Sequence, residues 1–281
     1  MNEPKNLTPK SFLKRLSNKK VDKISKFYKS KNISDFLDFA DEKSIKSFLK
    51  EHESDLLIEN LQKHETKNLK SYHVLKLLLD STSSCEISDA LSLLTNNNGV
   101  LKGLKSINGL KTYGRVVTVE TSSDDWGTSV LAIDNAKNEE VLFIKSSDKD
   151  KHDFKKNRSA VWGELTSKYS RKKGIAGTFI LGYVRDIDFV VDFDYPVFAI
   201  DTCPNAGSPL GFGTINQSLK LHDFNINPGD FVFGDKSGVV LIPKELFKIT
   251  IRKLINIKIN ETNIKNNLKK GKNFSRVINL K

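Results

Sequence analysis

Two short segments of the sequence combine residue types that bind an anion and a cation. Arg185 and Asp186 are adjacent; a guanidinium group presents a planar fork to a carboxylate or an enolate oxygen, and a carboxylate is a ligand that Mg²⁺ or Mn²⁺ accepts. The second segment is Gly163-Glu-Leu-Thr166, which we place at a helix start, where free backbone N–H groups attract carboxylate or phosphate. Adjacent opposite charges are also common on protein surfaces, so the spacing alone leaves both interpretations open.

Other common reaction centres are not indicated by the sequence. Cys85 and Cys203 form no CxxC or Cys/His spacing, so we predict no zinc site and expect both to be small core residues. His52, His64 and His73 lack the i,i+4 spacing that puts metal ligands on one helix face, and we expect them at the surface. No serine-hydrolase elbow is present.

Six segments of the chain follow one another in the order of a known family pattern. They are Ser84–Leu91, Ala160–Ser167, Lys173–Gly177, Gly182–Asp188, Pro196–Ala199 and Asn227–Pro243. On these segments the chain resembles, over about residues 83–272, the RraA-like family, which contains regulators of ribonuclease activity and class II 4-hydroxy-4-methyl-2-oxoglutarate aldolases. The resemblance implies an RraA-like swivelling β/β/α domain.

The resemblance also implies roles for the two segments. Asp186 would hold a divalent metal, Mg²⁺ or Mn²⁺, largely through water, and Arg185 would contact the pyruvyl group of the substrate. The turn Gly163-Glu164-Leu165-Thr166 would grip the substrate through backbone N–H groups, and Glu164 would add an acidic side chain near the metal. Aldolase members often have Asp where this chain has Glu164, which leaves the role of the longer side chain open.

A further glutamate is implied at the subunit boundary. Glu261, followed by Ile264, Leu268 and Gly271 at the family spacing, matches a catalytic glutamate that reaches in from the neighbouring subunit. We therefore expect a homotrimer or a hexamer made of two trimers. The implied reaction is metal-dependent lyase chemistry: aldolase or decarboxylase cleavage of 4-hydroxy-2-oxo diacids or oxaloacetate, releasing pyruvate, with Arg185 stabilising the enolate.

The net charge supports a rival function. The chain of 281 residues carries +12, but residues 1–32 hold +8 and residues 244–281 hold +9, so residues 33–243 sum to −5. Basic ends suit a non-catalytic protein that binds a ribonuclease or RNA. Lys outnumbers Arg 39 to 7, which is also expected of a coding sequence rich in A and T. No apolar run is long enough to span a bilayer, and we expect a cytoplasmic protein.

The elements that must position these residues form an α/β domain behind a helical region. Residues 1–78 show apolar residues at three- and four-residue spacing and are expected to form a small, basic, all-helical region. Residues 79–243 form the α/β domain, and residues 244–281 a basic C-terminal helix at the subunit interface. The predicted helices are Ile87–Leu94, Val130–Ala136, Val161–Lys172 and about Lys244 to Gly271; the predicted strands are Gly114–Val119, Glu140–Ile144, Gly177–Leu181 and Phe231–Phe233, with apolar segments at Val197–Ala199 and Gly238–Pro243.

Several other polar and aromatic residues are better explained by structure than by chemistry. We expect Trp162 to pack beside the helix start, Asp89 to serve a helix or subunit contact, and His222 to lie at the surface. Asp230 and Asp235 follow glycines in turns, where carboxylates brace loops. Residues 146–159 form a longer and more polar lead into the Gly163 turn than the family usually has, and we expect them to reshape or cover the site.

Overall fold

The computed structural model describes residues 76, 78–147, 159–221 and 225–280. The predicted helices of the first 75 residues, the histidines among them, His222 and most of the 146–159 segment lie outside the described residues. The chain divides into two compact units, Ser83–Phe247 and a second that joins Met1–Thr82 with Lys248–Lys281. Each unit is described by itself below.

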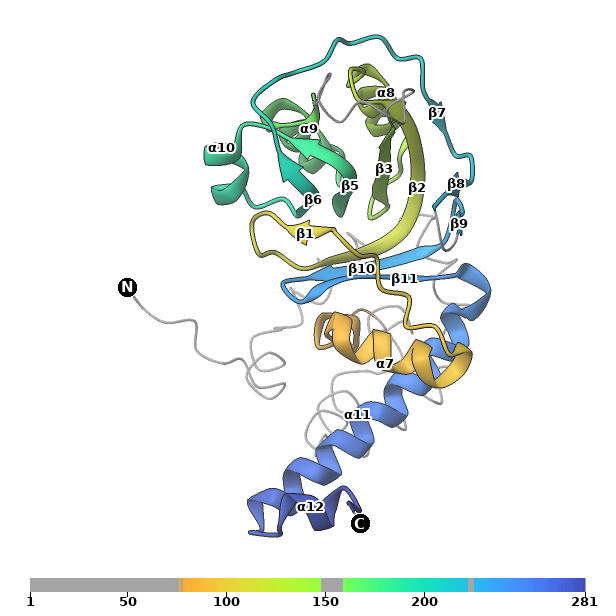
Figure 1. The fold of residues 1–281 in the computed structure, drawn as a ribbon, viewed down its shortest axis with the longest axis vertical. Coiled ribbons are helices and arrows are strands. Elements are labelled where there is room, and N and C mark those ends of the chain that lie inside the picture. The colour runs from red at the N-terminus through yellow and green to blue at the C-terminus, as the bar shows by residue number, and fades with distance from the viewer. Residues whose placement is uncertain (1–75, 77, 148–158, 222–224, 281) are drawn as a thin grey trace, which may run out of the picture. The chain divides into compact units, whose positions relative to one another are not determined.

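One curved sheet organises the unit Ser83–Phe247 (Figure 1). In the described residues its order is β1-β6-β5-β3-β2-β10-β11, with β4 added beside β5 and β7 beside β2, while β8 and β9 form a separate pair. Because β1 also contacts β11, the sheet nearly closes on itself. The strands are β1 Lys105–Ser106, β2 Thr112–Ser122, β3 Val141–Ser147, β4 Ala160–Trp162, β5 Gly177–Val184, β6 Val197–Thr202, β7 Thr214–Ile215, β8 Leu219–Lys220, β9 Asn225–Ile226, β10 Phe231–Asp235 and β11 Gly238–Ile242.

The parallel part of the sheet determines where a site can form. β2 and β3, β3 and β5, β4 and β5, and β5 and β6 all pair in parallel. Their carboxyl ends therefore meet at one edge of the sheet, the place where ligands collect in open α/β sheets. β10 pairs antiparallel with both β2 and β11, and β1 pairs antiparallel with β6.

Hydrophobic side chains fill both faces of this sheet. On one face, the helices α8 and α10 pack Ile133 and Val190 against strand residues such as Ile144. On the other face, the Phe179 and Phe198 rings stack with centroids 4.7 Å apart. A Cβ at Gly234 would lie 2.7 Å from the Phe179 ring, so this position on β10 requires glycine. Packed hydrophobic side chains therefore support the sheet on both of its faces.

Helices begin and end where local capping allows. In the unit Ser83–Phe247, Ser83 and Glu86 form a reciprocal capping box at the start of α7. Gly174, in the left-handed region at φ 78°, ends α9. The described helices are α7 Ser84–Thr95, α8 Gly127–Asn135, α9 Glu164–Lys173, α10 Ile187–Asp192, the 3₁₀ turn Lys244–Leu246, α11 Phe247–Lys269 and α12 Phe274–Val277.

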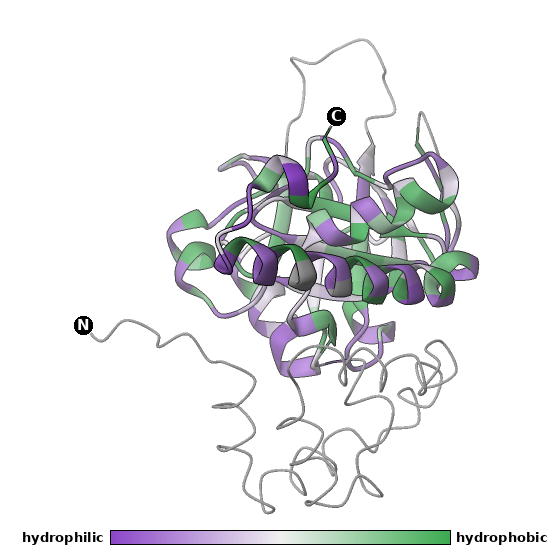
Figure 2. Cartoon of the chain, turned by 90° about the horizontal axis from the view of Figure 1, so that it is seen from below, coloured by the Kyte–Doolittle hydropathy of each residue, from purple (hydrophilic) through white to green (hydrophobic). Residues whose placement is uncertain are grey.

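In the described part of the other unit the main element is α11, which the sequence predicts as a long helix ending near Gly271. Within this unit the Lys258 Nζ donates to the Ser81 carbonyl at 3.0 Å. Gly271, at φ 78°, follows the end of the helix. Among the described residues no helix is long and apolar enough to cross a membrane; Figure 2 shows hydrophilic residues interrupting the hydrophobic ones along the helices.

The structure corrects three sequence-based expectations. Val161 and Trp162 belong to β4, so the predicted helix Val161–Lys172 starts only at Glu164. The segment Ile187–Asp192 is the helix α10, which the sequence analysis did not predict. Cys85 is exposed and Cys203 is half-buried, so neither is a core residue. Cys85 lies in the first turn of α7 on its exposed face, and burial follows the helix face rather than residue type.

Candidate active site

Two adjacent strand ends form the framework of the site. β5 ends at Val184 and is followed directly by Arg185 and Asp186; β4, its parallel neighbour, ends at Trp162 and is followed by Gly163. Asp186 lies in the left-handed region, at φ 56° and ψ 44°, and is the N-cap of α10. Its carbonyl accepts backbone bonds at 3.0 Å from both Phe189 and Val190. This turn directs the Asp186 side chain toward the Gly163 turn.

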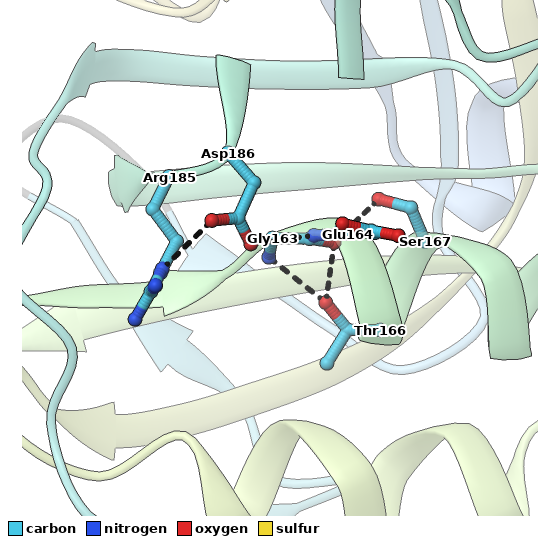
Figure 3. A network of polar contacts seen from close by, with 6 residues as sticks. All are labelled: Gly163, Glu164, Thr166, Ser167, Arg185 and Asp186. Atoms are coloured by element: carbon cyan, nitrogen blue, oxygen red, sulfur yellow. Dashed lines mark hydrogen bonds and ion pairs between the residues drawn. The ribbon is translucent and has the colours of Figure 1, made fainter. Parts of the chain in front are cut away.

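The Asp186 carboxylate joins the two turns (Figure 3). Its Oδ2 accepts a hydrogen bond from the Glu164 backbone N–H at 3.0 Å, and its Oδ1 accepts one from the Arg185 Nε at 3.0 Å. The side chains of Arg185 and Asp186 are 40% and 32% exposed, so both groups face solvent as well as each other. The structure thus brings Arg185, Asp186 and the 163–166 turn into one cluster.

Hydrogen bonds from neighbouring side chains fix the backbone of the Gly163 turn. The Thr166 Oγ1 accepts from the Gly163 N–H at 2.9 Å and donates to the Gly163 carbonyl at 3.0 Å. The Ser167 Oγ donates to the same carbonyl at 2.8 Å and accepts from the buried Trp162 Nε1 at 2.9 Å. The amides of Gly163 and Glu164 therefore have partners within the chain, while those of Leu165 and Thr166, in the first turn of α9, have no carbonyl of a preceding helical turn to bond to.

Two charged side chains flank the cluster on α9. The Glu164 carboxylate forms an ion pair with Lys168, one helical turn later. The Lys168 Nζ also lies 4.5 Å from the centroid of the Phe189 ring on α10. Glu164 is thus engaged by a cation rather than directed at Asp186 by a hydrogen bond.

The donor set fits a hydrated divalent cation. Each oxygen of the Asp186 carboxylate takes one hydrogen bond within the chain, and a carboxylate oxygen has further lone pairs to offer. Mg²⁺ commonly uses one or two carboxylates and fills its other positions with water and substrate oxygens. No group of three metal-binding side chains occurs among the residues that the structure describes, and Asp186 is the residue of this cluster that would hold the cation.

Glu261 lies in the other unit. It is on α11, where its Oε2 pairs with the Lys265 Nζ at 2.9 Å. Its role in a neighbouring subunit's site stays a prediction.

Asp125 is a residue that the sequence analysis missed. It is 1% exposed and lies just after β2, and its Oδ1 accepts from the Gly127 and Gly211 amides at 2.8 Å each. Its Oδ2 accepts from the Phe212 amide at 2.9 Å and the Thr128 hydroxyl at 2.7 Å. Burial acts to raise the pKa of Asp125, but these donors outweigh it and lower the pKa to about 2. Asp125 therefore fastens the 210–213 loop to the start of α8.

Two of the residues expected to be structural, Trp162 and Asp230, are buried among other residues of the fold. Trp162 is buried and its ring stacks on Tyr195. The Asp230 carboxylate accepts one hydrogen bond from the Asn227 amide, in its own turn, and one from the Lys244 amide, outside that turn. Burial raises the pKa of Asp230, and those two amide donors only partly offset the rise. Asp89 is exposed on α7, and its predicted subunit contact stays a prediction.

The chain is similar in sequence to a protein family and to individual proteins, and in fold to a solved structure. Residues 84–241 match the RraA-like family, described as Aldolase/RraA. The uncharacterised protein MJ0644 of Methanocaldococcus jannaschii is 36% identical over 186 residues, 63% of this chain and 86% of that protein. A Halalkalibacterium halodurans protein named "Putative 4-hydroxy-4-methyl-2-oxoglutarate aldolase" is 32% identical over 158 residues, 56% of this chain and 71% of that protein. The crystal structure of an uncharacterised Pseudomonas syringae pv. tomato protein aligns with a TM-score of 0.59 at 25% identity, covering 72% of this chain and 96% of that one.

Proposed function

Because the chain belongs to the RraA-like family, which includes both aldolases and ribonuclease inhibitors, we propose that it is a divalent-metal-dependent lyase that releases pyruvate from 4-hydroxy-2-oxo diacids or oxaloacetate. One observation carries the proposal: the Asp186 carboxylate lies between the Arg185 guanidinium and the start of α9, at the carboxyl edge of parallel strands. A regulator that only binds another protein does not require this arrangement of cation site and anion donors.

Each group in the cluster has a chemical role in the proposed reaction. Asp186 holds the hydrated Mg²⁺ or Mn²⁺, and the chemistry that the cation supplies when bound is polarisation of the 2-oxo group. Arg185 uses its Nε on Asp186, and Figure 3 shows its terminal nitrogens directed away from that carboxylate. Those nitrogens are free of the Asp186 carboxylate and bind the substrate carboxylate or the enolate oxygen.

The bond changes follow from that placement. The C3–C4 bond breaks: in a 4-hydroxy-2-oxo diacid, water takes the C4 hydroxyl proton and C4 leaves as the carbonyl carbon of a second product, whereas in oxaloacetate C4 leaves as CO₂. The electron pair of the broken bond forms the enolate of pyruvate, which the Arg185 guanidinium stabilises electrostatically. The first-turn amides of Leu165 and Thr166 bind the carboxylate of the pyruvyl half. Water then protonates C3 to give pyruvate. No covalent nucleophile is needed.

The proposal is tested by following pyruvate. The wild-type protein with Mn²⁺ should release pyruvate from oxaloacetate and from a 4-hydroxy-2-oxo diacid faster than Mn²⁺ alone, and EDTA should abolish the difference. Asp186→Ala and Arg185→Ala should each lose at least about 100-fold in kcat/KM. Asp188→Ala, which removes an exposed carboxylate two residues later, is the matched control and should retain activity. Full activity of Asp186→Ala would refute the assignment.

A non-catalytic function is supported by a separate observation, the basic ends of the chain. Residues 1–32 and 244–281 carry +8 and +9, and such charge favours an acidic ribonuclease partner or RNA. RNA binding measured across a salt series distinguishes the two functions. Affinity that falls steeply with salt, together with no pyruvate release, would support the regulator; pyruvate release without such affinity would support the lyase.

A further inference from the structure

Lys168 lies at the rim of the candidate site and is held in place from two sides. It is four residues after Glu164 on α9, so both side chains project from the same helix face, and its ammonium pairs with the Glu164 carboxylate. On its other side the ammonium lies 4.5 Å from the centroid of the Phe189 ring. A lysine restrained by two groups has lost most of its conformational freedom before any ligand arrives.

The ring that supports Lys168 is tied to the candidate metal ligand. Phe189 belongs to α10, the helix that Asp186 caps, and the Phe189 amide donates to the Asp186 carbonyl at 3.0 Å. The Phe189 ring also packs on the Phe193 ring, with centroids 4.7 Å apart. On the other side, Glu164 donates its amide to the Asp186 carboxylate. Lys168 therefore has a fixed place relative to Asp186 through both α9 and α10.

We propose that Lys168 is the residue that binds the second, distal carboxylate of a diacid substrate. The inference rests on the proposed function, because it assigns a role within the same site. An ammonium has three N–H donors; one is used on Glu164 and the Phe189 ring covers one side. The half-exposed side chain, 49% accessible, has donors left for an incoming carboxylate without breaking the ion pair.

Charge balance supports a diacid in particular. Glu164 and Asp186 contribute two negative charges, and Arg185 and Lys168 two positive ones, so the four groups sum to zero. A divalent cation with a dianionic substrate keeps that sum, whereas a monoanion leaves an excess positive charge. If a neutral side chain replaced Lys168, the diacid would instead face the uncompensated Glu164 carboxylate.

The next cation on α9 provides a comparison within the same protein. Arg171 lies over the Phe193 ring at 5.1 Å and pairs with Asp194 at 3.0 Å. It repeats the arrangement of Lys168, a cation between an aromatic ring and a carboxylate, but its ring is that of Phe193, the C-cap of α10, and neither partner contacts Asp186 by a hydrogen bond. Replacing Arg171 removes the same charge from the same helix, α9, without removing a side chain of the Asp186 cluster.

The experiment measures binding, so that it does not depend on turnover. Calorimetric titrations with Mn²⁺ present compare 2-oxoglutarate with 2-oxopentanoate, in which a methyl group replaces the distal carboxylate. The wild-type protein should prefer the diacid by about tenfold or more, as expected for one charge-assisted hydrogen bond. Lys168→Met should abolish the preference and leave 2-oxopentanoate binding unchanged, Lys168→Arg should restore part of it, and Arg171→Met should keep it.

Two other outcomes of the titrations would contradict the assignment of Lys168 to the distal carboxylate. A wild-type protein that binds both ligands equally, or a Lys168→Met variant that weakens both ligands equally, would overturn it; the second result would mean that Lys168 only supports Glu164. Pyruvate release is measured separately on the same wild-type protein. A diacid preference that depends on Lys168, in a protein that releases no pyruvate, would refute the proposed lyase and retain the carboxylate site.

Discussion

Gly163 is the residue on which the shape of the candidate site depends most directly. A Cβ there would lie 2.5 Å from the Asp186 Oδ2 and 2.8 Å from the Arg185 Cγ. The backbone of Gly163 is extended, so the requirement for glycine is purely steric. Gly163→Ala should displace the Asp186 carboxylate by about an ångström, and we expect a loss of about 100-fold or more in pyruvate release.

The same variant should remain folded, because Asp186 and Arg185 are partly exposed and can move outward. Its thermal unfolding, followed by circular dichroism, should be close to that of the wild-type protein, and calorimetry should show weaker Mn²⁺ binding. A Gly163→Ala protein with wild-type activity would show that the Asp186 carboxylate does not act from the place it occupies here.

The buried Asp125 makes stability depend on pH in a defined direction. Its pKa in the folded protein is about 2, below the ordinary value of 3.8. The ionised carboxylate therefore stabilises the fold above about pH 4, and this contribution is lost as the pH falls through 2. The two pKa values correspond to roughly 2 kcal/mol in the free energy of unfolding.

Asp125→Asn tests this contribution, since asparagine keeps the shape but cannot ionise. At pH 7 the variant should be less stable than the wild-type protein by about 2–3 kcal/mol in urea unfolding. The difference should shrink as the pH is lowered from 5 toward 3. Asp230, whose pKa is raised, titrates in both proteins, and its contribution cancels in the difference. A difference that stays constant with pH would contradict the role of the ionised carboxylate.

At the scale of elements, α7 is fastened to the sheet by a side chain far away in the sequence. The Asp235 carboxylate, at the end of β10, accepts from the Ser84 amide and hydroxyl at 2.7 Å each. Asp235→Ala would leave both buried donors of Ser84 without that partner and should cost about 2 kcal/mol in the free energy of unfolding. Ser83→Ala, which removes only the local cap, should cost about 1 kcal/mol.

Hydrogen exchange distinguishes the two variants. In Asp235→Ala the amides of α7 should exchange faster as a group, because the helix loses its attachment to β10. In Ser83→Ala only the first turn should exchange faster. Equal and local effects in both variants would mean that the Asp235 contact contributes little.

The elements also show what the sequence could and could not predict. Periodicity and glycines located the main helices and the parallel strands, because those signals are local. Val161 and Trp162 were assigned to a helix, although pairing with β5 makes them a strand, and that pairing is not local. The Gly234-Asp235 pair indicates a carboxylate that braces its own turn; the bond from Asp235 to Ser84 joins residues 151 positions apart, which no motif encodes.

The polar residues at the strand ends likewise include some that the sequence could predict and one that it could not. Arg185, Asp186 and the Gly163 turn could be predicted because family motifs and strand ends both pointed to them. Asp125 could not, since the seven hydrogen bonds that its carboxylate accepts converge only after the 210–213 loop returns to α8. The signal for Asp125 in the sequence is an Asp followed by Trp-Gly, a few residues after the end of a strand.

At the scale of the whole molecule, we predict that the active assembly is a trimer or a pair of trimers in which Glu261 completes the site of a neighbour. Asp186→Ala and Glu261→Ala should each be inactive alone. In mixed oligomers obtained by co-expression, some sites combine an intact Asp186 with an intact Glu261 from the next subunit. For equal amounts and random assembly about a quarter of the sites are complete, so about a quarter of the wild-type activity should return.

The matched control mixes Asp186→Ala with Arg185→Ala. Both residues come from the same strand end of the same chain, so no mixed oligomer contains a complete site and no activity should return. Light scattering on the same samples reports the assembly. A fully active monomer, or a Glu261→Ala protein with wild-type activity, would refute the shared site, and the +9 charge of residues 244–281 would then need a partner other than a second copy of this chain.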